Sequence, residues 1–524
     1  MARDVIVVGA GPVGLMLAGE LRLCGGDDLD VVVYERLPEP SRESRGASFT
    51  RRTAECFDQR GLLGRLGGTE RADSHFGGIP IDLGLFEEDH FSARGVPQYR
   101  TERMLEEWVT ELGVPVVRGR EVTGFRETDD GVVVTFEGPG GAGEERAAYA
   151  VGCDGGRSTL RELAGIGFPG AEPTRGFLTA DVLGIEPRRR RIGEDLPGGS
   201  MVMAMDLEGG ITRVVVHERG MGPRERDALT YAELADAWHR LTGESIHHGE
   251  CRWMSCFTDA SRVADAYRSG RVLLAGDATH VQPPAMAQGL SVGVQDVVNL
   301  GWKLAAVVAG RAPESLLDTY EAERRPVGRE LARNARAAIE LRLTGEEMDP
   351  VRGVFGELAG HKGAAGHLAA MLSGLGIRYE VGEGDHPLLG VRMPPGVEVV
   401  RAGGSRARIA ELLRSGRGLL LATGDGSDGA ARLAEDWDPR VESVRGTWAP
   451  GAGAIPGARE LPRTVLVRPD GYVAWTSPGS AAGLADALGH WFGAPRTDAP
   501  RTDAPRTDAP PVGGAGQPAA RPAG

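Results

Sequence analysis

Three glycines near the start of the chain are spaced to hold a phosphate group. Gly9, Gly11 and Gly14 follow the apolar run VIVV at 5–8 and precede LMLAGELRL, which has helical spacing. In such a strand, turn and helix, the first glycine permits the tight turn, the second lets backbone amides reach a pyrophosphate, and the third lets helix and strand pack closely. The helix dipole favours the phosphate charge. We therefore predict dinucleotide binding by this turn, including Pro12 and Val13.

Three acidic residues stand where apolar strands are expected to end. Glu35 closes VVVYE at 31–35, Asp154 follows AVGC at 150–153, and Asp277 follows RVLLAG at 271–276. An acid in this position, beside a glycine, can bond a ribose or ribityl hydroxyl at close backbone range. Either of the last two motifs alone is more often a turn with a capping Asp.

In this order and with these gaps, the motifs resemble the single-component FAD-dependent aromatic hydroxylases, the family of para-hydroxybenzoate hydroxylase. The resemblance is closest to the bacterial polyketide hydroxylases that tailor angucyclines and anthracyclines, and it covers residues 1 to about 495. Supporting stretches are HFGGIPIDLG at 75–84, LPGGSMVM at 196–203 and HPLLGVRMP at 386–394. The resemblance implies FAD as cofactor, NADPH or NADH as transient reductant, and O₂ that adds at the flavin C4a carbon as a hydroperoxide.

The resemblance also implies roles for individual residues. Glu35 would bind the adenosine ribose, with Arg36 beside the adenine, while Arg45 and Gln98 would hold the pyrophosphate and ribityl region. The other cofactor-binding predictions are Asp154, Gly155, Gly276, Asp277, Pro284, Ala287, Gln288, Gly289 and Leu290. The amides of the last two would meet the flavin pyrimidine oxygen at a helix N-terminus, where the dipole stabilises the negative charge of reduced flavin.

Position 286 departs from the family pattern. The loop commonly reads P-x-G-G-Q-G or P-x-G-A-K-G, whereas here Pro284 is followed by Ala285, Met286, Ala287, Gln288 and Gly289. Pro284 and Met286 are the candidate catalytic positions, at the flavin edge where oxygen adds. Met286 occupies space that glycine leaves open, and it adds strain if its φ is positive. Either the side chain points away from the flavin, or the site handles peroxide poorly and uses FAD structurally.

The expected fold is α/β. A Rossmann-like FAD-binding domain at 1–175 and 267–394 would be interrupted by an antiparallel β-sheet substrate domain at 176–266, and a thioredoxin-like domain without C-x-x-C would follow at 395–495. Predicted substrate contacts are Phe76, Met201, Met203 and Val215, although a core stripe is the alternative for the methionines. The Pro-rich repeat within 496–524 predicts a disordered tail.

Composition narrows the classes of partner. A formal net charge of −14 argues against nucleic acid as a partner, and no segment is long and apolar enough to span a bilayer. Five cysteines without a C-x-x-C pair fit a reducing cytoplasm. We predict no metal, because IHHGEC at 246–251 is more typical of a polar loop. A homodimer is possible for this family.

The sequence is compatible with three alternative functions. The first is a monooxygenase that hydroxylates, or inserts oxygen into, a polycyclic aromatic polyketide of antibiotic-type metabolism. The second is a FAD-containing enzyme that cyclises or dehydrates a polyketide without redox chemistry. The third is a binding or regulatory protein that keeps FAD for stability. Coupled consumption of NADPH separates the first from the others, and product formation without electron input separates the second from the third.

Overall fold

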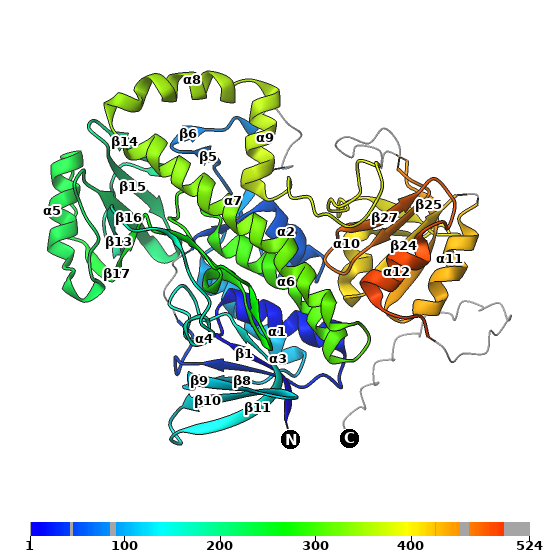
Figure 1. Ribbon diagram of the computed structural model, residues 1–524. Helices are drawn as coiled ribbons and strands as arrows, with labels where there is room; N and C mark the ends of the chain where they lie inside the picture. Colours follow the sequence, from blue (N-terminus) through cyan, green and yellow to red (C-terminus); the bar gives the residue numbers. More distant parts are fainter. Residues whose placement is uncertain (1, 42–45, 84–90, 425, 451–460, 497–524) are drawn as a thin grey trace, which may run out of the picture.

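The computed structural model describes residues 2–41, 46–83, 91–424, 426–450 and 461–496 (Figure 1). It has a mixed α/β fold, which confirms the predicted fold class. The domain boundaries at 175, 266 and 394 stay predictions. Arg45 and residues 497–524 of the predicted tail lie outside the described residues.

A largely parallel sheet forms the base of the molecule, at the bottom of Figure 1. Its strands, in spatial order, are β19 (Arg268–Ser269), β20 (Val272–Leu274), β11 (Gly143–Gly152), β1 (Arg3–Val8), β2 (Val31–Glu35) and β8 (Val116–Arg118), with β10 (Gly131–Glu137) on β11 and β9 (Glu121–Thr128) on β10. The near-continuous apolar runs of β1, β2 and β20 are buried, as expected for strands covered on both faces.

The register of this sheet brings the three predicted motifs to one edge. Val8 pairs with Tyr34 on β2 and with Gly152 on β11, and Gly152 pairs with Leu274 on β20. These strands are parallel, so the residues that follow them leave the sheet side by side. The glycine turn, Glu35, Asp154 and Gly276 are therefore neighbours, although they are far apart in the sequence.

An antiparallel sheet stands beside this base, at the left of Figure 1. Its strands, in spatial order, are β14 (Arg190–Leu196), β15 (Ser200–Asp206), β16 (Ile211–His217), β13 (Gly176–Leu183) and β17 (Glu250–Thr258). Alternate residues face opposite sides. Val202 and Ala204 pack towards Trp238 of α5 (Tyr231–Thr242), whereas Met201 packs towards Leu343 of α7 (Asp318–Leu343).

Helices surround the two sheets. They are α1 (Pro12–Gly25), α2 (Arg51–Asp58), α3 (Gln98–Glu111), α4 (Thr159–Leu163), α6 (Gly289–Val308), α8 (Asp349–Ala359) and α9 (Lys362–Ser373). Smaller strands complete this part: β3 (Ser48–Phe49), β4 (Glu70–Ala72) and β7 (Ala93–Gly95); β5 (His75–Phe76) and β6 (Ile79–Pro80); β12 (Gly170–Ala171), β18 (Ser261–Val263) and β21 (His280–Val281). Figure 1 shows α7 running from the base sheet to the antiparallel sheet. No helix in the described ranges is long and apolar enough to cross a membrane.

The C-terminal part has its own sheet and core, at the right of Figure 1. The strands, in spatial order, are β23 (Arg406–Arg408), β22 (Glu398–Val400), β25 (Val441–Trp448), β24 (Gly418–Thr423), β26 (Thr464–Val467) and β27 (Val473–Ser477). The helices are α10 (Ile409–Leu412), α11 (Asp428–Ala434) and α12 (Leu484–Phe492). β24 and β25 are parallel and β26 and β27 antiparallel, which gives the βαβ and ββα halves of a thioredoxin-like fold.

A buried ionic cluster fastens this part to the helices. Arg468, in the turn between β26 and β27, donates to both oxygens of Glu323 on α7 at 2.6 and 2.9 Å. Lys303 of α6 donates to the same carboxylate at 2.9 Å. Burial lowers the pKa of Lys303 to about 8, whereas Arg468 and Lys303 outweigh burial and hold the pKa of Glu323 at about 2. The pair is therefore ionised at neutral pH, and each charge depends on its partners.

Glu323→Gln is expected to destabilise the protein by about 3 kcal/mol, because it removes the only ion-pair partner of Lys303 among the described residues and leaves the buried Arg468 with Asp470 alone. The measurement is the thermal unfolding midpoint of the full chain. Glu330→Gln on the same helix is the control: Glu330 and its partner Arg333 are 53% and 72% exposed, and the change should cost under about 0.5 kcal/mol. Equal midpoints for the two variants would contradict the prediction.

Candidate cofactor and substrate site

The glycine turn has the geometry of a phosphate cradle. Gly9 has a φ of +105°, and a Cβ there would lie 2.5 Å from the carbonyl oxygen of Cys153. A Cβ at Gly14 would lie 1.9 Å from the carbonyl oxygen of Gly9. A Cβ at Gly11 would meet no atom within 4 Å, so the space before the N-terminus of α1 is open. Gly11 caps this helix without a side-chain hydrogen bond, and the first turn contains no acid. The first amides of α1 are thus available to an anion.

Two of the predicted acids border this turn. The carboxylate of Glu35 accepts hydrogen bonds from the amides of Ala10 and Leu37, both at 2.8 Å, which fix it beside the turn. Arg36 is exposed next to it. Asp154 accepts one bond, from the amide of Leu160 at 3.3 Å, and its Oδ1 is buried without a partner among the described residues. Burial raises the pKa of Asp154. A hydroxyl donor of a ligand would satisfy that oxygen.

The turn after β20 packs against both main helices. A Cβ at Gly276 would lie 2.9 Å from Cγ2 of Val13, and a Cβ at Gly293 would lie 2.7 Å from the same atom. The beginning of α1, the Gly276 turn and the first turns of α6 are therefore in contact. Asp277 is exposed at this junction, on the short 3-10 helix Gly276–Ala278. Gly155 has a φ of +84° and open space around it.

Gln98 and Leu290 come together at Gly46. The amide of Gly46 donates to Oε1 of Gln98 at 3.0 Å. A Cβ at Gly46 would lie 3.4 Å from that oxygen and 3.7 Å from Cδ1 of Leu290. The beginnings of α3 and α6 thus meet the segment that follows Arg45, which itself lies outside the described residues.

The loop before α6 places its strain at residue 287 and not at 286. Ala287 has a φ of 51° and is the one non-glycine residue with positive φ in the described part of the chain. Its amide donates to the carbonyl oxygen of Pro284 at 3.3 Å, which closes a tight turn. Met286 packs against an apolar cluster that includes Phe76 and Leu341. Met286 therefore has an ordinary backbone conformation and a packing role on the side of α7 and α9.

The side-chain amide of Gln288 is directed to the end of α9, and a role for Gln288 at the cofactor stays a prediction. Its Nε2 donates to the carbonyl oxygens of Met371 at 3.1 Å and Leu372 at 2.8 Å, at the end of α9. The physical reason is that α9 ends at Ser373, where the carbonyls run short of helical donors: that of Met371 accepts only a long bond of 3.4 Å from the amide of Gly374 in the described chain. Gln288 caps α6 without a side-chain bond, and no acid lies in the first turn. The first helical bond is from Val292 to Gln288, so the amides of Gly289 and Leu290 have no partner within the helix.

Two apolar clusters adjoin the loop. The first contains Phe76, Ile81, Ala338, Leu341, Ala359, Ala369 and Leu372, with Met286 packed on it. The second contains Phe177, Met201, Val215, Ile339 and Leu343, with Met203 and Phe257 packed on it. Ala285 packs against both. The four predicted substrate contacts therefore lie on either side of a single loop residue.

Sequence reasoning missed several residues of this region. Phe177 stacks on Phe257 with ring centroids 4.6 Å apart, and Ile339 and Leu343 come from the distant helix α7. Arg342, also on α7, donates from Nε to Asp195, while its Nη2 is buried without a partner among the described residues. Burial and the charge of Arg342 lower the pKa of His75 to about 4. No local pattern marks these residues, because only the fold brings them together.

Two family models match the chain. The model described as FAD binding domain covers residues 2–335, and the model described as aromatic-ring hydroxylase, C-terminal, covers residues 386–495. The residues of the cradle fit FAD on structural grounds: two uncapped helix N-termini meet at Val13, Gly11 leaves space in front of one of them, and Asp154 has an unpaired oxygen.

Similar proteins of known activity cover nearly the whole chain. CabE, an aromatic hydroxylase from angucycline biosynthesis, has a crystal structure that matches with a TM-score of 0.88 and 51% identity, over 95% of this chain and 100% of that chain. The 12-dehydrotetracycline 5-monooxygenase/anhydrotetracycline 6-monooxygenase of Streptomyces rimosus subsp. rimosus is 41% identical, over 94% of this chain and 100% of that protein. The dialkyldecalin synthase of Streptomyces rugosporus is 38% identical, over 94% of this chain and 99% of that protein.

Gly11→Ala and Gly14→Ala should fail in different ways. Gly11 has a φ of −74° and free space, so the alanine variant should fold normally but bind FAD about tenfold or more weakly, since its methyl group lies where the pyrophosphate approaches. Gly14→Ala would place a methyl group 1.9 Å from a carbonyl oxygen and should destabilise the apoprotein itself. FAD titration and the unfolding midpoint of the apoprotein separate the two effects. Full FAD affinity in the Gly11 variant would refute the cradle.

Met286→Gly tests where the loop is strained. Because Met286 does not have a positive φ and packs on the apolar cluster, glycine should lower stability by about 1 kcal/mol or more. Met286→Leu, which conserves volume, is the matched control and should remain close to the parent. A Met286→Gly protein more stable than the parent would show that residue 286 carries the strain after all. The unfolding midpoint of the FAD-bound protein is the measurement.

Proposed function

Because the chain belongs to the family of FAD-dependent aromatic-ring hydroxylases, we propose that it acts on a polycyclic aromatic polyketide. The chain is a flavin-dependent monooxygenase that takes electrons from a nicotinamide cofactor and one oxygen atom from O₂. The proposal concerns the substrate and the preference for NADPH. It is supported by the names of the relatives, which refer to tetracycline intermediates and angucycline biosynthesis, and by the apolar side chains around Ala285.

The residues at the strand edge would hold FAD by its charged and hydroxylated parts. The amides of α1, with Gly11 in front, would bind the pyrophosphate, and Glu35 would accept from the adenosine ribose while it keeps its two backbone bonds. The buried Oδ1 of Asp154 would accept from a further hydroxyl. Bound FAD supplies hydride acceptance and oxygen activation, which no side chain provides.

At the ring end, the chain contributes electrostatics and exclusion of water. The amides of Gly289 and Leu290 point out of an uncapped helix N-terminus, where they would stabilise negative charge on the flavin ring. The clusters on either side of Ala285 would cover the reacting edge with apolar side chains. An oxygen-transfer step needs such cover, because water diverts reactive oxygen species from the substrate.

The observation that carries the proposal is the sharing of Ala285 by two apolar clusters. One cluster joins the antiparallel sheet to Ile339 and Leu343 of α7, and the other joins residues of α7, α8 and α9 to the hairpin of β5 and β6. A flat multi-ring substrate would fit between these two walls with its edge towards the loop. Phe76, Met201, Met203 and Val215 would then be substrate contacts, together with Phe177, Phe257 and Leu343.

A second candidate is cyclisation of a polyketide intermediate with FAD in a structural role. The similarity to a dialkyldecalin synthase favours it. The position of Met286 does not, because this side chain packs towards Leu341 and leaves the turn of Pro284 and Ala287 intact. The cytoplasm is proposed as the compartment, in line with five free cysteines. Homodimerisation and the absence of a nucleic-acid partner stay predictions.

The test is anaerobic stopped-flow absorbance of the flavin band after mixing holoprotein with NADPH, with and without anhydrotetracycline or angucycline-type quinones. We expect that a substrate accelerates bleaching of the flavin, and that admission of ¹⁸O₂ gives a product with one labelled oxygen. NADH in place of NADPH is the control for the reductant. Conversion of a polyketide while the flavin stays oxidised would instead establish the second candidate.

A further inference from the structure

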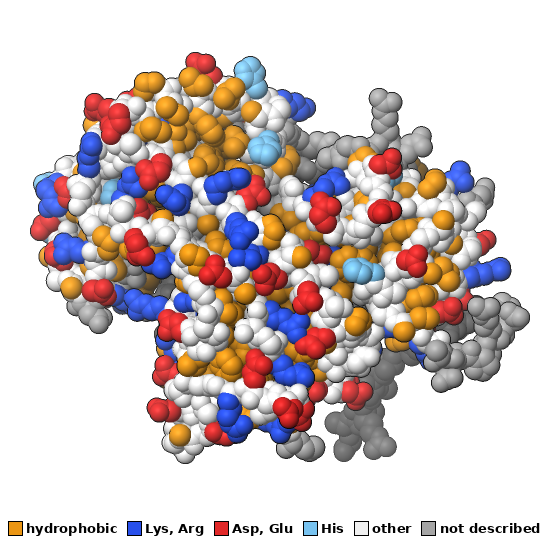
Figure 2. All heavy atoms as spheres, viewed as in Figure 1, with side chains coloured by type: hydrophobic (Ala, Val, Ile, Leu, Met, Phe, Trp, Pro, Cys, Tyr) orange, Lys and Arg blue, Asp and Glu red, His pale blue; other side chains and the backbone are white. Residues whose placement is uncertain are grey.

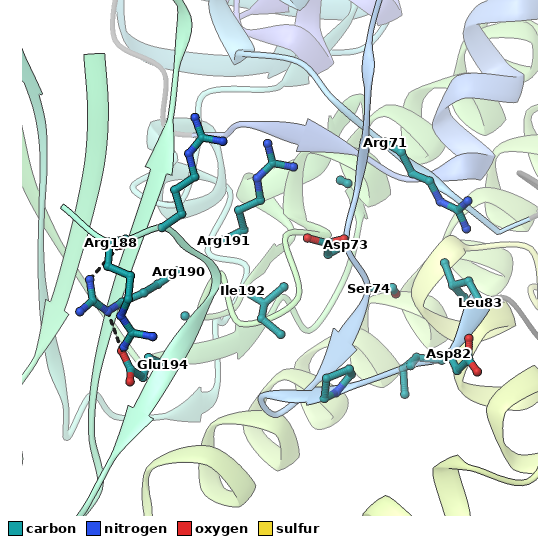
Figure 3. A pocket seen from close by; sticks show the side chains of 15 residues that line it. Arg71, Asp73, Ser74, Asp82, Leu83, Arg188, Arg190, Arg191, Ile192 and Glu194 are labelled. Carbon is teal, nitrogen blue, oxygen red and sulfur yellow. Dashed lines mark hydrogen bonds and ion pairs between the residues drawn. The ribbon is translucent and has the colours of Figure 1, made fainter. Parts of the chain in front are cut away.

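A groove lies between the edge of the antiparallel sheet and the small hairpin of β5 and β6. Its volume of about 620 Å³ falls within the roughly 300–1,000 Å³ of small-molecule sites. Residues 71–74 and 80–83 line one side, and residues 188–194 line the other. Figure 3 shows the two sides facing each other, with Arg191 and Ile192 on the β14 side and Asp73 and Ser74 opposite.

The groove concentrates positive charge on an acidic protein. Five arginines line it (Arg71, Arg188, Arg189, Arg190 and Arg191) against three acids (Asp73, Asp82 and Glu194), although the chain as a whole has a net charge of −14. Arg190 is bound to Glu194 and Glu244 and is buried, so it is structural. Arg188 is paired with Glu194 and Arg189 with Asp206, so Arg71 and Arg191 are the cations that remain for a ligand.

A ligand that binds these two arginines would displace few of their existing contacts. The side chain of Arg71 is exposed and forms no ion pair or hydrogen bond with any described residue, while its backbone pairs with β7. Arg191 lies 3.4 Å from Glu70, and the two side chains are 48% and 81% exposed. An ion pair this exposed contributes at most about 1 kcal/mol, so an anionic ligand would compete with it readily.

An irregularity in β14 directs Arg191 and Ile192 into the groove. Arg190 pairs with Ala204 and Glu194 with Val202, so three residues of β14 face one residue of β15. Gly193, in this bulge, has a φ of +82°. Bulges of this kind re-aim side chains and occur next to active sites. The edge strand is thus shaped to present a guanidinium and an apolar side chain together.

Both walls of the groove lead to the candidate substrate site. Ile81 belongs to the apolar cluster of Phe76 and Met286. Gly193 lies against the other cluster, since a Cβ there would be 3.2 Å from Cε of Met201. The same Cβ would be 2.4 Å from Nη2 of Arg342, the buried nitrogen that has no partner in the described ranges. A guanidinium that is paired with Asp195 through Nε but has an Nη2 without a partner in the described chain therefore lies at the inner end of the groove.

We propose that this groove is the entrance subsite for the substrate and that it takes an ionised polyphenol, whose negative oxygens pair with Arg191, while Arg71 adds positive charge from the other side of the segment 71–74 (Figure 3). The inference rests on the proposed function, which takes the substrate to be a polycyclic aromatic polyketide. A phenol of such a substrate, when conjugated with a quinone carbonyl, ionises more readily than a simple phenol. The rings lie against Ile81 and Ile192, and a guanidinium can pair with oxygen and stack on a ring at once. The chemistry recognised is a planar, apolar anion.

The test compares alizarin, ionised at a pH above its first ionisation, with its neutral 1,2-dimethoxy derivative. Binding to FAD-loaded protein is followed by the absorbance of the dye, without NADPH. The variant Arg71→Gln/Arg191→Gln should bind alizarin about tenfold more weakly, as expected for the loss of charge-assisted contacts, and should bind the neutral derivative as the parent does. Added salt should weaken only the binding of alizarin.

Arg252→Gln is the matched control. Arg252 lies on β17 of the same sheet, pairs with Glu250 at 2.8 Å and is 49% exposed, close to the 48% of Arg191. It should leave the binding of alizarin unchanged. Unchanged alizarin binding in the double variant would overturn the proposal, as would an increase in the KM for NADPH alone, because the groove would then hold the reductant's phosphates.

Failure of the subsite and failure of the proposed function have different signatures. Dye binding needs no turnover, so arginine-dependent binding of alizarin supports the subsite even in a protein that never oxidises NADPH. Substrate-stimulated oxidation of NADPH with dye binding that is indifferent to Arg71 and Arg191 refutes the subsite and leaves the monooxygenase intact.

Discussion

The buried carboxylate of Asp296 is the interaction on which the cofactor site depends. It accepts hydrogen bonds from the amide of Gly276 at 3.2 Å, from Nε2 of His280 at 2.8 Å and from Nε of Arg324 at 2.7 Å. Although burial acts to raise the pKa of Asp296, Arg324 and His280 hold it below the usual range. A buried charge with this many donors is tolerated only while all of them stay in place. The turn after β20, the helix α6 and the helix α7 are therefore locked together at one point.

This lock determines the shape of the loop at 284–290. Its two ends are fixed, because Gly276 and His280 precede it and Asp296 follows it on α6. The chain must reverse within a few residues, and it does so through the bond from Ala287 to Pro284, with Ala287 in the left-handed region. Strain of this kind persists only where surrounding contacts over-determine the backbone. Here the contacts of Gln288 with α9 and of Met286 with the apolar cluster that includes Phe76 supply that restraint.

The cofactor edge was open to prediction from sequence, and the substrate side was not. Gly9, Gly14 and Glu35 act within a single βαβ unit, so spacing alone indicates their positions. Residues such as Phe177 and Leu343 come together only because α7 crosses to the antiparallel sheet. No pattern in the sequence around either residue predicts this contact. For Gln288, the loop pattern predicts a cofactor contact, which stays a prediction, but it does not predict that carbonyls at the end of α9 bind the side-chain amide. The position of Met286 in the loop motif likewise did not predict the direction of its side chain.

Charge and burial divide the route to the site into two stages. A protein with a net charge of −14 repels an anion at long range. An anionic ligand therefore approaches only where the local positive charge outweighs the net negative charge of the protein. The β14 bulge provides that charge at the surface, where water still screens it and release is easy. Further in, the environment of His75 is dry enough that burial and Arg342 keep its imidazole neutral above a pH of about 4. In the same setting, a phenolate paired with Arg342 would hold its charge without a competing cation from His75, and an electron-rich ring is what oxygen transfer requires.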